Sequence, residues 1–272
     1  MLKQVIVMKW GTKYGPEYVN RMYGMVARNI TGPFSFVCFT DDSAGLRKEV
    51  AAHPLPELGC ECPTRTRGQW RKLALWGKSV DGLRPGPALF IDLDSVVVGN
   101  IDPYFEVGSP DDVFLARNWS RPLQRLGQTS VFRFPVGGHP GILDRFRADP
   151  QGVADRFHYE QHFVTRSVPG GIRLWPRRWT LHFRLHCLPI FPLRMFLPAR
   201  LPSGARIVTF PGHPNPGEAM EGRWLQRQVE RPGRTEHLLN TFRQGKRIER
   251  RPWRHVNRYL LPVDWIRRHW VE

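Results

Sequence analysis

The segment Ala88-Leu89-Phe90-Ile91-Asp92-Leu93-Asp94-Ser95-Val96-Val97-Val98 decides the fold of this 272-residue chain. Its first four residues are all apolar, which predicts a strand buried on both faces, as the central strands of parallel sheets are. Two aspartates follow where this strand ends. Because ligands of open α/β sheets gather at the carboxyl ends of the strands, the segment predicts both a central strand and a binding site beside it.

The segments on the amino-terminal side fit the same sheet. Gln4 to Met8 is a short β-branched run that predicts a first strand, and Phe34 to Phe39 predicts a second. Pro16 opens a helix between them, since proline is tolerated in a first turn and apolar residues recur on one face. A further helix is expected from about Gln69. This β-α-β order predicts an α/β fold with a mostly parallel, Rossmann-like sheet flanked by helices.

The second half of the chain is less regular and is rich in proline, arginine and aromatic residues. Candidate strands are Val113 to Ala116, Ser130 to Phe134 and Ile207 to Phe210. We expect one catalytic unit in two parts: residues 1–140 with the Asp-x-Asp motif, and residues 141–272 with the irregular, basic and aromatic remainder.

Asp92 and Asp94 are spaced to bind one cation together. Alternate residues of an extended chain point the same way, so both carboxylates face one side. Hard oxygen ligands suit Mg²⁺ or Mn²⁺, which keep coordination positions open for phosphate oxygens. The competing interpretation is a solvated turn, but unpaired charges at the end of a buried strand would be costly. The pattern therefore favours a metal site.

The net charge of +17 and the pI near 10.7 predict an anionic partner. Nucleic acid, an acidic membrane surface and a phosphorylated small molecule all qualify. Late in the chain basic residues alternate with aromatic ones, a mixture that suits the headgroup region of an anionic membrane. The residues concerned are Arg243, Lys246, Arg247, Arg250, Arg251, Trp253, Arg254, Arg258, Tyr259, Trp265, Arg267, Arg268 and Trp270.

No stretch of the sequence approaches the roughly 20 apolar residues that cross a bilayer. Residues 1–10 are too short, and too soon interrupted by lysine, for a signal peptide. We therefore expect a cytoplasmic location, with peripheral contact at the inner face of the membrane. Cys60-Glu61-Cys62 lacks the spacing of a zinc site, so reduced thiols are expected.

The block from Gln69 to Phe105 resembles the donor-site region of glycosyltransferases with the GT-A fold, particularly family 8 and its bacterial relatives. In that family a helix with a basic residue and leucine precedes a strand ending in Asp-x-Asp, and a Val-rich stretch and an Asn-Ile-Asp-like turn come next. The matching residues here are Arg71, Lys72, Leu73, Leu89 to Asp94, Val96 to Val98 and Asn100 to Asp102. The resemblance implies Mn²⁺ or Mg²⁺ at Asp92 and Asp94, with Arg71 or Lys72 on the donor phosphates.

Looser matches imply further donor contacts. Gln128 to Phe132 resembles the segment that lines the family's sugar pocket, with Ser130 in it, although the usual Asn is absent. The first strand, its loop and the end of the second strand lie where the family binds the nucleoside, although ordinary loop chemistry explains these residues equally well. The donor-binding candidates there are Lys9, Trp10, Tyr14 and Asp41.

Glu160-Gln161 resembles an Asp-Gln pair that contacts the donor and acceptor sugars, which implies a catalytic role for both residues. Family 8 implies retention of the anomeric configuration. An inverting enzyme would need a carboxylate base near the acceptor hydroxyl, and Glu160 or Asp112 could serve.

The segment from Ile207 to Pro216 resembles a family element in which a His completes the metal shell and a Lys meets the diphosphate. Thr209 occupies the His position here, and Asn215 the Lys position. His213 is then the candidate third metal ligand, and Arg223 the candidate for the missing cation. The alternative is a turn-rich loop with a surface histidine.

The resemblance thus implies transfer of a sugar from a nucleotide-diphospho-sugar, a UDP-sugar being favoured, to a glycan or lipid-linked acceptor in bacterial cell-surface polysaccharide biosynthesis. A sugar nucleotidyltransferase is the nearest alternative, but the loop from Lys9 to Gly15 is poor in glycine for that class. A basic nucleic-acid-binding protein is the other alternative, and it rests on charge alone.

Overall fold

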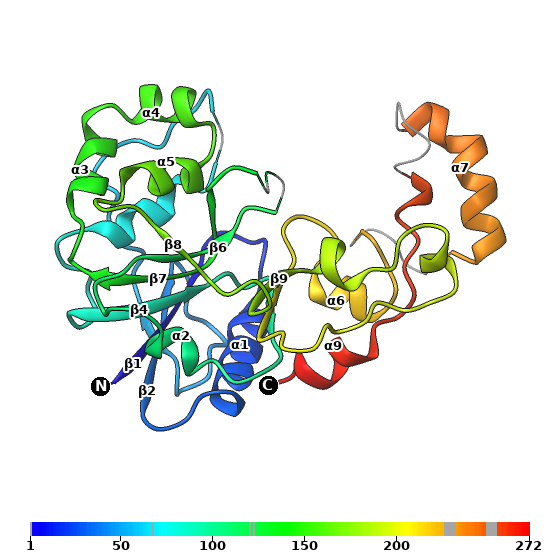
Figure 1. Ribbon diagram of the computed structural model, residues 1–272, viewed down its shortest axis with the longest axis horizontal. Coiled ribbons are helices and arrows are strands. Elements are labelled where there is room, and N and C mark those ends of the chain that lie inside the picture. Colours follow the sequence, from blue (N-terminus) through cyan, green and yellow to red (C-terminus); the bar gives the residue numbers. More distant parts are fainter. Residues whose placement is uncertain (1, 67, 120, 122, 226–231, 249–254) are drawn as a thin grey trace.

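The computed structural model describes the chain except residues 1, 67, 120, 122, 226–231 and 249–254. A seven-stranded sheet lies in the left half of the molecule in the view of Figure 1, in the order β3-β2-β1-β4-β7-β6-β8. Its strands are β1 (Lys3–Lys9), β2 (Phe34–Thr40), β3 (Ala51–His53), β4 (Gly86–Ile91), β6 (Phe114–Arg117), β7 (Gly127–Val136) and β8 (Arg173–Leu174).

Most neighbours in this sheet run parallel. The pairs β3·β2, β2·β1, β1·β4 and β6·β8 are parallel, and only β7 runs against its two neighbours, β4 and β6. The predicted α/β fold with a mostly parallel sheet is confirmed. The predicted strands at Gln4 to Met8, Phe34 to Phe39 and Ala88 to Ile91 are confirmed as β1, β2 and β4.

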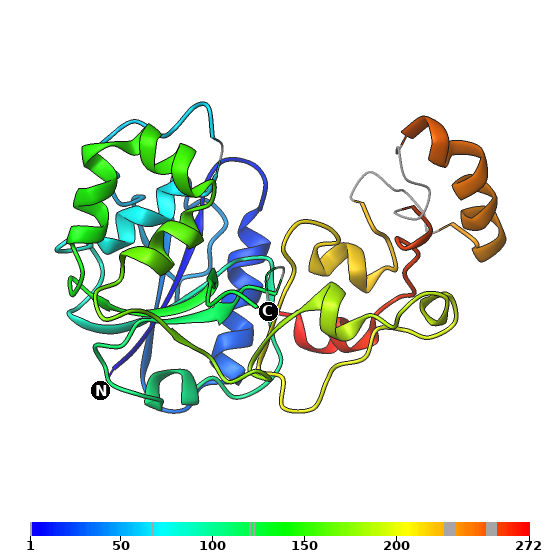
Figure 2. The same cartoon turned by 45° about the horizontal axis from the view of Figure 1, so that its top comes forward.

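The sheet separates two apolar cores because successive residues of a strand face opposite sides. In β1, Val5 and Val7 belong to one core while Ile6 and Met8 belong to the other. The first core contains α1 (Pro16–Arg28), and the second is covered by α3 (Gly141–Ala148), α4 (Pro150–Phe157), α5 (Glu160–Ser167) and the 3₁₀ segment η1 (Trp70–Trp76) (Figure 2). The sheet is therefore the middle layer of three.

Two of these helical regions differ from expectation. The helix expected from about Gln69 is a 3₁₀ segment, with Lys72 N–H donating to the carbonyl of Gln69. Six of its seven residues are buried, so packing on several sides rather than an amphipathic α-helical face fixes its course. The helices α3 to α5 lie in the half that the sequence described as irregular.

A second, three-stranded sheet joins the two halves of the chain, in the order β5-β10-β9. Its strands are β5 (Ser95–Val97), β9 (Thr180–His182) and β10 (Ile207–Thr209), with β10 antiparallel to β5 and parallel to β9. The chain therefore leaves the large sheet after Asp94 and enters the small one. The N–H of Phe210 donates to the carbonyl of Asp94 at 3.1 Å, so both sheets meet at the predicted motif.

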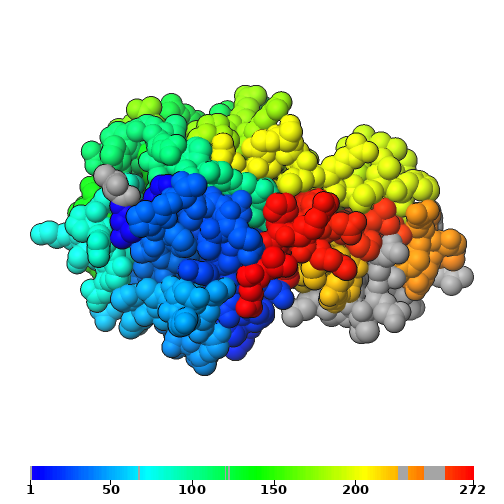
Figure 3. All heavy atoms as spheres, turned by 90° about the horizontal axis from the view of Figure 1, so that it is seen from below, coloured from blue at the N-terminus to red at the C-terminus, as the bar shows by residue number. Residues whose placement is uncertain are grey.

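The remaining elements come after the small sheet or connect strands. They are α2 (Pro103–Glu106), the π-helical turn η2 (Phe183–Cys187), the 3₁₀ turn η3 (Leu193–Met195), α6 (Pro216–Met220), α7 (Arg234–Ile248) and α9 (Asp264–His269). The end of the chain returns to α1 (Figure 3), where the Trp270 ring packs edge-on against Tyr18 at 5.2 Å between centroids. No helix in the described part of the chain combines the length and apolarity needed to cross a bilayer.

The basic and aromatic stretch near the end of the chain only partly matches its expected role at a membrane. Tyr259, Trp265 and Trp270 are buried, because they pack into the protein rather than outward. Arg250, Arg251, Trp253 and Arg254 lie outside the described residues, and the side chains of Arg243, Lys246 and Arg247 are likewise not described.

Candidate active site

A cavity of about 420 Å³ lies at the carboxyl ends of β1 and β4. Its volume falls in the range of small-molecule sites, roughly 300–1,000 Å³. The loop after β1 lines one side, the amino end of β7 another, and Pro211 and Gly212, just after β10, a third. The cavity brings together eight of the residues singled out in the sequence: Trp10, Tyr14, Lys72, Asp92, Asp94, Ser130, Glu160 and Gln161.

Asp92 and Asp94 both face this cavity, while Leu93 between them is buried in the apolar core. The backbone holds them in place: Asp92 N–H donates to the carbonyl of Ser130 at 2.8 Å. Burial, and next the negative charge of Asp92, raise the pKa of Asp94 above its usual range. The two carboxylates thus repel each other in a partly desolvated place, which a cation would relieve.

Lys72 is the buried cation of the site. Its Nζ lies 2.5 Å from Asp92 Oδ1 and 3.2 Å from the Thr129 carbonyl oxygen. Its side chain is only 5% exposed, so the ion pair is shielded from water. Arg71, its neighbour, is exposed and does not line the cavity. The structure therefore brings Lys72, and not Arg71, to the predicted motif.

Tyr14 covers the second aspartate. Its hydroxyl donates to Asp94 Oδ2 at 2.9 Å, and the Lys13 ammonium lies 4.5 Å from the Tyr14 ring centroid. Burial and the charge of Asp94 raise the pKa of Tyr14, so the phenol stays protonated and keeps donating. Lys13 also lines the cavity, and its charge lowers the pKa of Asp94.

Glu160 is the first residue of α5 and lines the same cavity. Its Oε2 accepts a hydrogen bond of 2.6 Å from Thr129 Oγ1, and its Oε1 has no hydrogen-bond partner among the described residues. Burial raises the pKa of Glu160 to about 7, against the opposing effect of the Lys72 charge. The carboxyl group therefore changes protonation near neutrality, as a proton-transferring or sugar-binding group can.

Lys9 and Asp41 lie beside the cavity and brace its loops. Lys9 Nζ donates to the carbonyl of Asp42 at 2.9 Å, and Asp41 Oδ2 accepts from the N–H of Gly11 at 2.8 Å. Both contacts tie the loop after β1 to the end of β2. Neither side chain lines the cavity.

His213 is directed elsewhere. Its Nδ1 lies 3.2 Å from Glu218 Oε2, and His213 does not line the cavity. Thr209, at the position of the family's histidine, is buried and donates to the carbonyl of Leu181. Within the described residues no three His, Cys, Asp or Glu side chains gather closely enough to hold a metal. Arg223 pairs with Glu221 instead of reaching the site.

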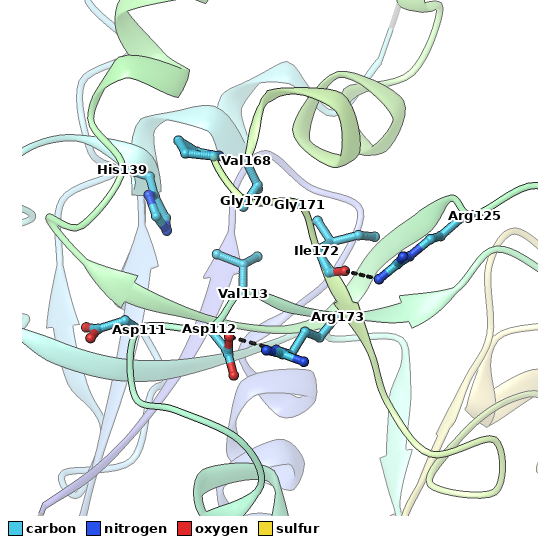
Figure 4. Close-up of a pocket in the computed structure, with 11 residues that line it drawn as sticks. Asp111, Asp112, Val113, Arg125, His139, Val168, Gly170, Gly171, Ile172 and Arg173 are labelled. Carbon is cyan, nitrogen blue, oxygen red and sulfur yellow. Dashed lines mark hydrogen bonds and ion pairs between the residues drawn. The ribbon is translucent and has the colours of Figure 1, made fainter.

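Asp112, the other candidate base, lies in a second cavity of about 210 Å³ (Figure 4). Its Oδ1 is 2.8 Å from Arg173 Nε, and it precedes the start of β6, which runs in the same direction as β4. Asp112 therefore stands toward the amino ends of these strands, whereas Asp92 and Asp94 come after a carboxyl end. The structure does not bring it together with the aspartate pair.

Sequence reasoning missed Lys13 and Thr129 as members of the site. Thr129 is the link between Lys72 and Glu160, and it lies within the Gln128 to Phe132 segment already singled out. The signal for Lys13 was its charge in the loop directly after the first strand, at the edge of the sheet where ligands gather.

Comparisons with known proteins place this geometry in a known fold. No protein-family model matches the chain, and no curated protein matches it in sequence. The galactosyltransferase LgtC, in complex with donor and acceptor sugar analogs, superposes with a TM-score of 0.55 at 11% identity, over 78% of this chain and 88% of that one. The fold is that of the GT-A glycosyltransferases.

Two further solved structures share this GT-A arrangement. The glycosyltransferase GlyE of Streptococcus pneumoniae TIGR4 has a TM-score of 0.54 at 10% identity, over 93% of this chain. The bifunctional glycosyltransferase WbbM has a TM-score of 0.52 at 9% identity, over 79% of this chain. This chain covers 60% of GlyE and 46% of WbbM, so both of those chains contain more than the shared part.

Proposed function

We propose that this protein is a glycosyltransferase that takes a sugar from a nucleotide-diphospho-sugar. The observation that carries the proposal is the pair of Asp92 and Asp94 facing one cavity beside the buried ammonium of Lys72, at the carboxyl end of β4. Two acids that would hold a divalent cation, beside an ammonium group, suit a diphosphate better than a neutral ligand. The GT-A fold agrees with it.

Sugar transfer is favoured by positive charge near the leaving group. Negative charge builds on the departing diphosphate while the anomeric carbon becomes oxocarbenium-like. Lys72 and Lys13 are the cations that line the cavity among the described residues, and both lie close to the aspartate pair. In the proposed reaction they stabilise the diphosphate, and Trp10 and Tyr14 form the wall toward the nucleoside.

The aspartate pair fits Mg²⁺ or Mn²⁺. These ions are commonly held by one or two carboxylates together with substrate phosphates and water, rather than by a complete protein cage. The mutual repulsion that raises the pKa of Asp94 is what such a cation would remove. Asp92 and Asp94 would hold the ion, which would supply Lewis-acid stabilisation of the diphosphate. Because His213 pairs with Glu218, the nucleotide and water would fill the remaining coordination positions of the ion.

A second group of residues that line the cavity is suited to bind the transferred sugar. Ser130, Glu160 and Gln161 present hydroxyl, carboxyl and amide groups to the cavity, and these groups pair with sugar hydroxyls. Glu160 in its protonated form donates one hydrogen bond, and in its charged form it accepts two or more. The proposed role of Glu160 and Gln161 is to orient the donor sugar and the incoming acceptor, with retention of the anomeric configuration as family 8 implies.

The acceptor is proposed to be a glycan or a lipid-linked sugar, with a UDP-sugar as donor and cell-surface polysaccharide synthesis as setting. The solved complex of LgtC holds donor and acceptor sugar analogs, which supports a sugar acceptor for a chain of the same fold. The proposed place of action is the cytoplasm and the inner face of the membrane.

A panel of nucleotide sugars tested for donor hydrolysis in the presence of Mn²⁺ addresses this proposal directly. One donor should be hydrolysed faster than the rest, with release of the nucleoside diphosphate and with loss of the reaction in EDTA. A sugar nucleotidyltransferase would instead form pyrophosphate from a nucleoside triphosphate and a sugar phosphate. Retention on UDP-agarose that depends on salt but not on EDTA would point to a nucleic-acid binder and count against the transferase.

A further inference from the structure

Large apolar side chains are exposed on the loop between β9 and β10 and on α7. The outer part of this loop and α7 lie at the end of the molecule farthest from the seven-stranded sheet (Figures 1 and 2). The loop between β9 and β10 carries most of these side chains: Ile190 is 73% exposed, Phe196 61% and Leu185 57%. The start of α7 lies beside this loop and adds two leucines. We call this surface the apolar tip; it comprises Ile190, Phe191, Leu193, Phe196, Leu197, Leu238 and Leu239.

Buried residues and hydrogen bonds hold the apolar tip in place. Met195 and Cys187 of the same loop are buried, and Arg194 donates from Nε to the carbonyl of Pro189 and from Nη1 to the carbonyl of Asn257. The Arg234 guanidinium at the start of α7 lies 5.1 Å from the Phe196 ring centroid. The loop and α7 therefore form one surface whose apolar side chains point outward from a fixed base.

The loop that carries most of the apolar tip contains no acidic residue, whereas Glu236 in the first turn of α7 lies close in sequence to Leu238 and Leu239. Between Glu160 and Glu218 there is no Asp or Glu, and the arginines in this interval are Arg166, Arg173, Arg177, Arg178, Arg184, Arg194, Arg200 and Arg206. The exposed apolar groups of the tip are thus accompanied by Arg194 and Arg200 of the same loop and by Arg234 of α7.

We propose that the apolar tip docks on an anionic lipid bilayer, with its apolar side chains in the interface and its arginines on the lipid phosphates. Contiguous exposed apolar surface of this kind marks a binding surface, and arginine is the residue best suited to phosphate. A second copy of the chain is a poorer occupant, because a symmetric contact would bring the same arginines face to face. The buried Tyr259, Trp265 and Trp270 take no part, so this surface differs from the one expected from the sequence.

The test is co-sedimentation of the full chain with vesicles of phosphatidylcholine alone and of phosphatidylcholine mixed with phosphatidylglycerol. Binding should require the anionic lipid and weaken with salt. The variant Phe196→Ser should lower the partition constant about ten-fold, because it removes one interfacial aromatic side chain. Arg234→Gln should lower it about five-fold. The controls are Leu123→Ser, fully exposed on another loop, and Lys48→Gln, exposed beside β3.

Equal binding to both kinds of vesicle, binding to neither, or equal losses in the control variants would overturn the proposal. Self-association that Phe196→Ser abolishes, in the absence of vesicle binding, would assign the apolar tip to a dimer contact and would overturn it as well. Thermal melting of each variant verifies folding. Vesicle binding needs no nucleotide sugar, so its failure is distinguishable from failure of the proposed transferase activity.

Discussion

The ammonium group of Lys72 lies 2.5 Å from Oδ1 of Asp92, and this contact joins the 3₁₀ segment η1 to the end of the central strand. The pair is shielded, since the Lys72 side chain is 5% exposed and that of Asp92 is 25% exposed. A charge held this firmly next to the cavity is preorganised for an anionic leaving group, because it needs no rearrangement when negative charge develops.

Lys72→Gln should therefore lower kcat for donor hydrolysis roughly 100-fold, by analogy with the loss of one preorganised electrostatic group. The measurement is steady-state release of nucleoside diphosphate. Arg71→Gln is the matched control, because it removes the neighbouring positive charge from an exposed position outside the cavity. Equal losses in the two variants would mean that overall charge, and not the Lys72 contact, matters.

Asp92→Asn and Asp94→Asn should each reduce metal-dependent turnover by about 100-fold or more, because each removes a charged ligand from the proposed cation site. The control is Asp81→Asn, an exposed acid that does not line the cavity. Full Mn²⁺-dependent turnover in the double Asn variant would refute both the metal site and the role of the motif.

Mn²⁺ should bind weakly to the protein alone and roughly ten-fold or more tightly in the presence of UDP. The reason is that the described residues place two carboxylates at the site and no group of three acidic, histidine or cysteine side chains, so phosphate oxygens complete the shell. Titration of Mn²⁺ followed by electron paramagnetic resonance, with and without UDP, measures both affinities. Tight binding without nucleotide would reveal a third protein ligand.

The aspartate motif was predictable because the evidence for it is local. Four apolar residues, then Asp92 and Asp94, are contiguous in sequence, and a buried strand must deliver the residues after its last position to the edge of the sheet. Trp10 and Tyr14 were implied by the family resemblance, and they line the same cavity because they come after a neighbouring parallel strand. The direction of a loop side chain depends on contacts with residues distant in sequence. Lys9 and Asp41 form hydrogen bonds that hold the loops together instead of lining the cavity.

The contact from Lys72 through Thr129 to Glu160 could not be predicted in this way. It joins η1, β7 and α5, and its hydrogen bonds span 57 and 31 residues of sequence. The antiparallel pairing of β7 with β4 brings Thr129 to the end of β4 at which Asp92 stands. Sequence pattern suggested the strand but not its direction or its register.

The same limit applies to the surface. Alternating Arg and Trp near the end of the chain has the composition of a membrane face, but composition does not say which side of a chain turns inward. Trp265 and Trp270 fill the core beside α1, whereas Ile190 and Phe196, in a proline-rich loop without periodic pattern, are exposed.

Glu160→Gln should change how stability depends on pH. Burial raises the pKa of Glu160 from 4.5 to about 7, so in this interval the folded protein holds a proton that the unfolded chain has lost. The free energy of unfolding should therefore fall as pH rises from about 4.5 to 7, by on the order of 3 kcal/mol, and level off above that range. The neutral, nearly isosteric amide removes this titration, and the variant should lose the decline.

Urea denaturation at several pH values measures the effect. The stability of the Gln variant relative to wild type should be greater at pH 8 than at pH 4.5. At pH 8 the wild-type carboxylate is charged in a buried place, with only Thr129 as its hydrogen-bond donor among the described residues. Glu106→Gln, which removes an exposed carboxylate, should keep the wild-type slope. If the free energies of unfolding of wild type and Glu160→Gln fall alike between pH 4.5 and 7, another group binds the proton in this interval. Glu160 is then not a carboxyl that titrates near neutrality.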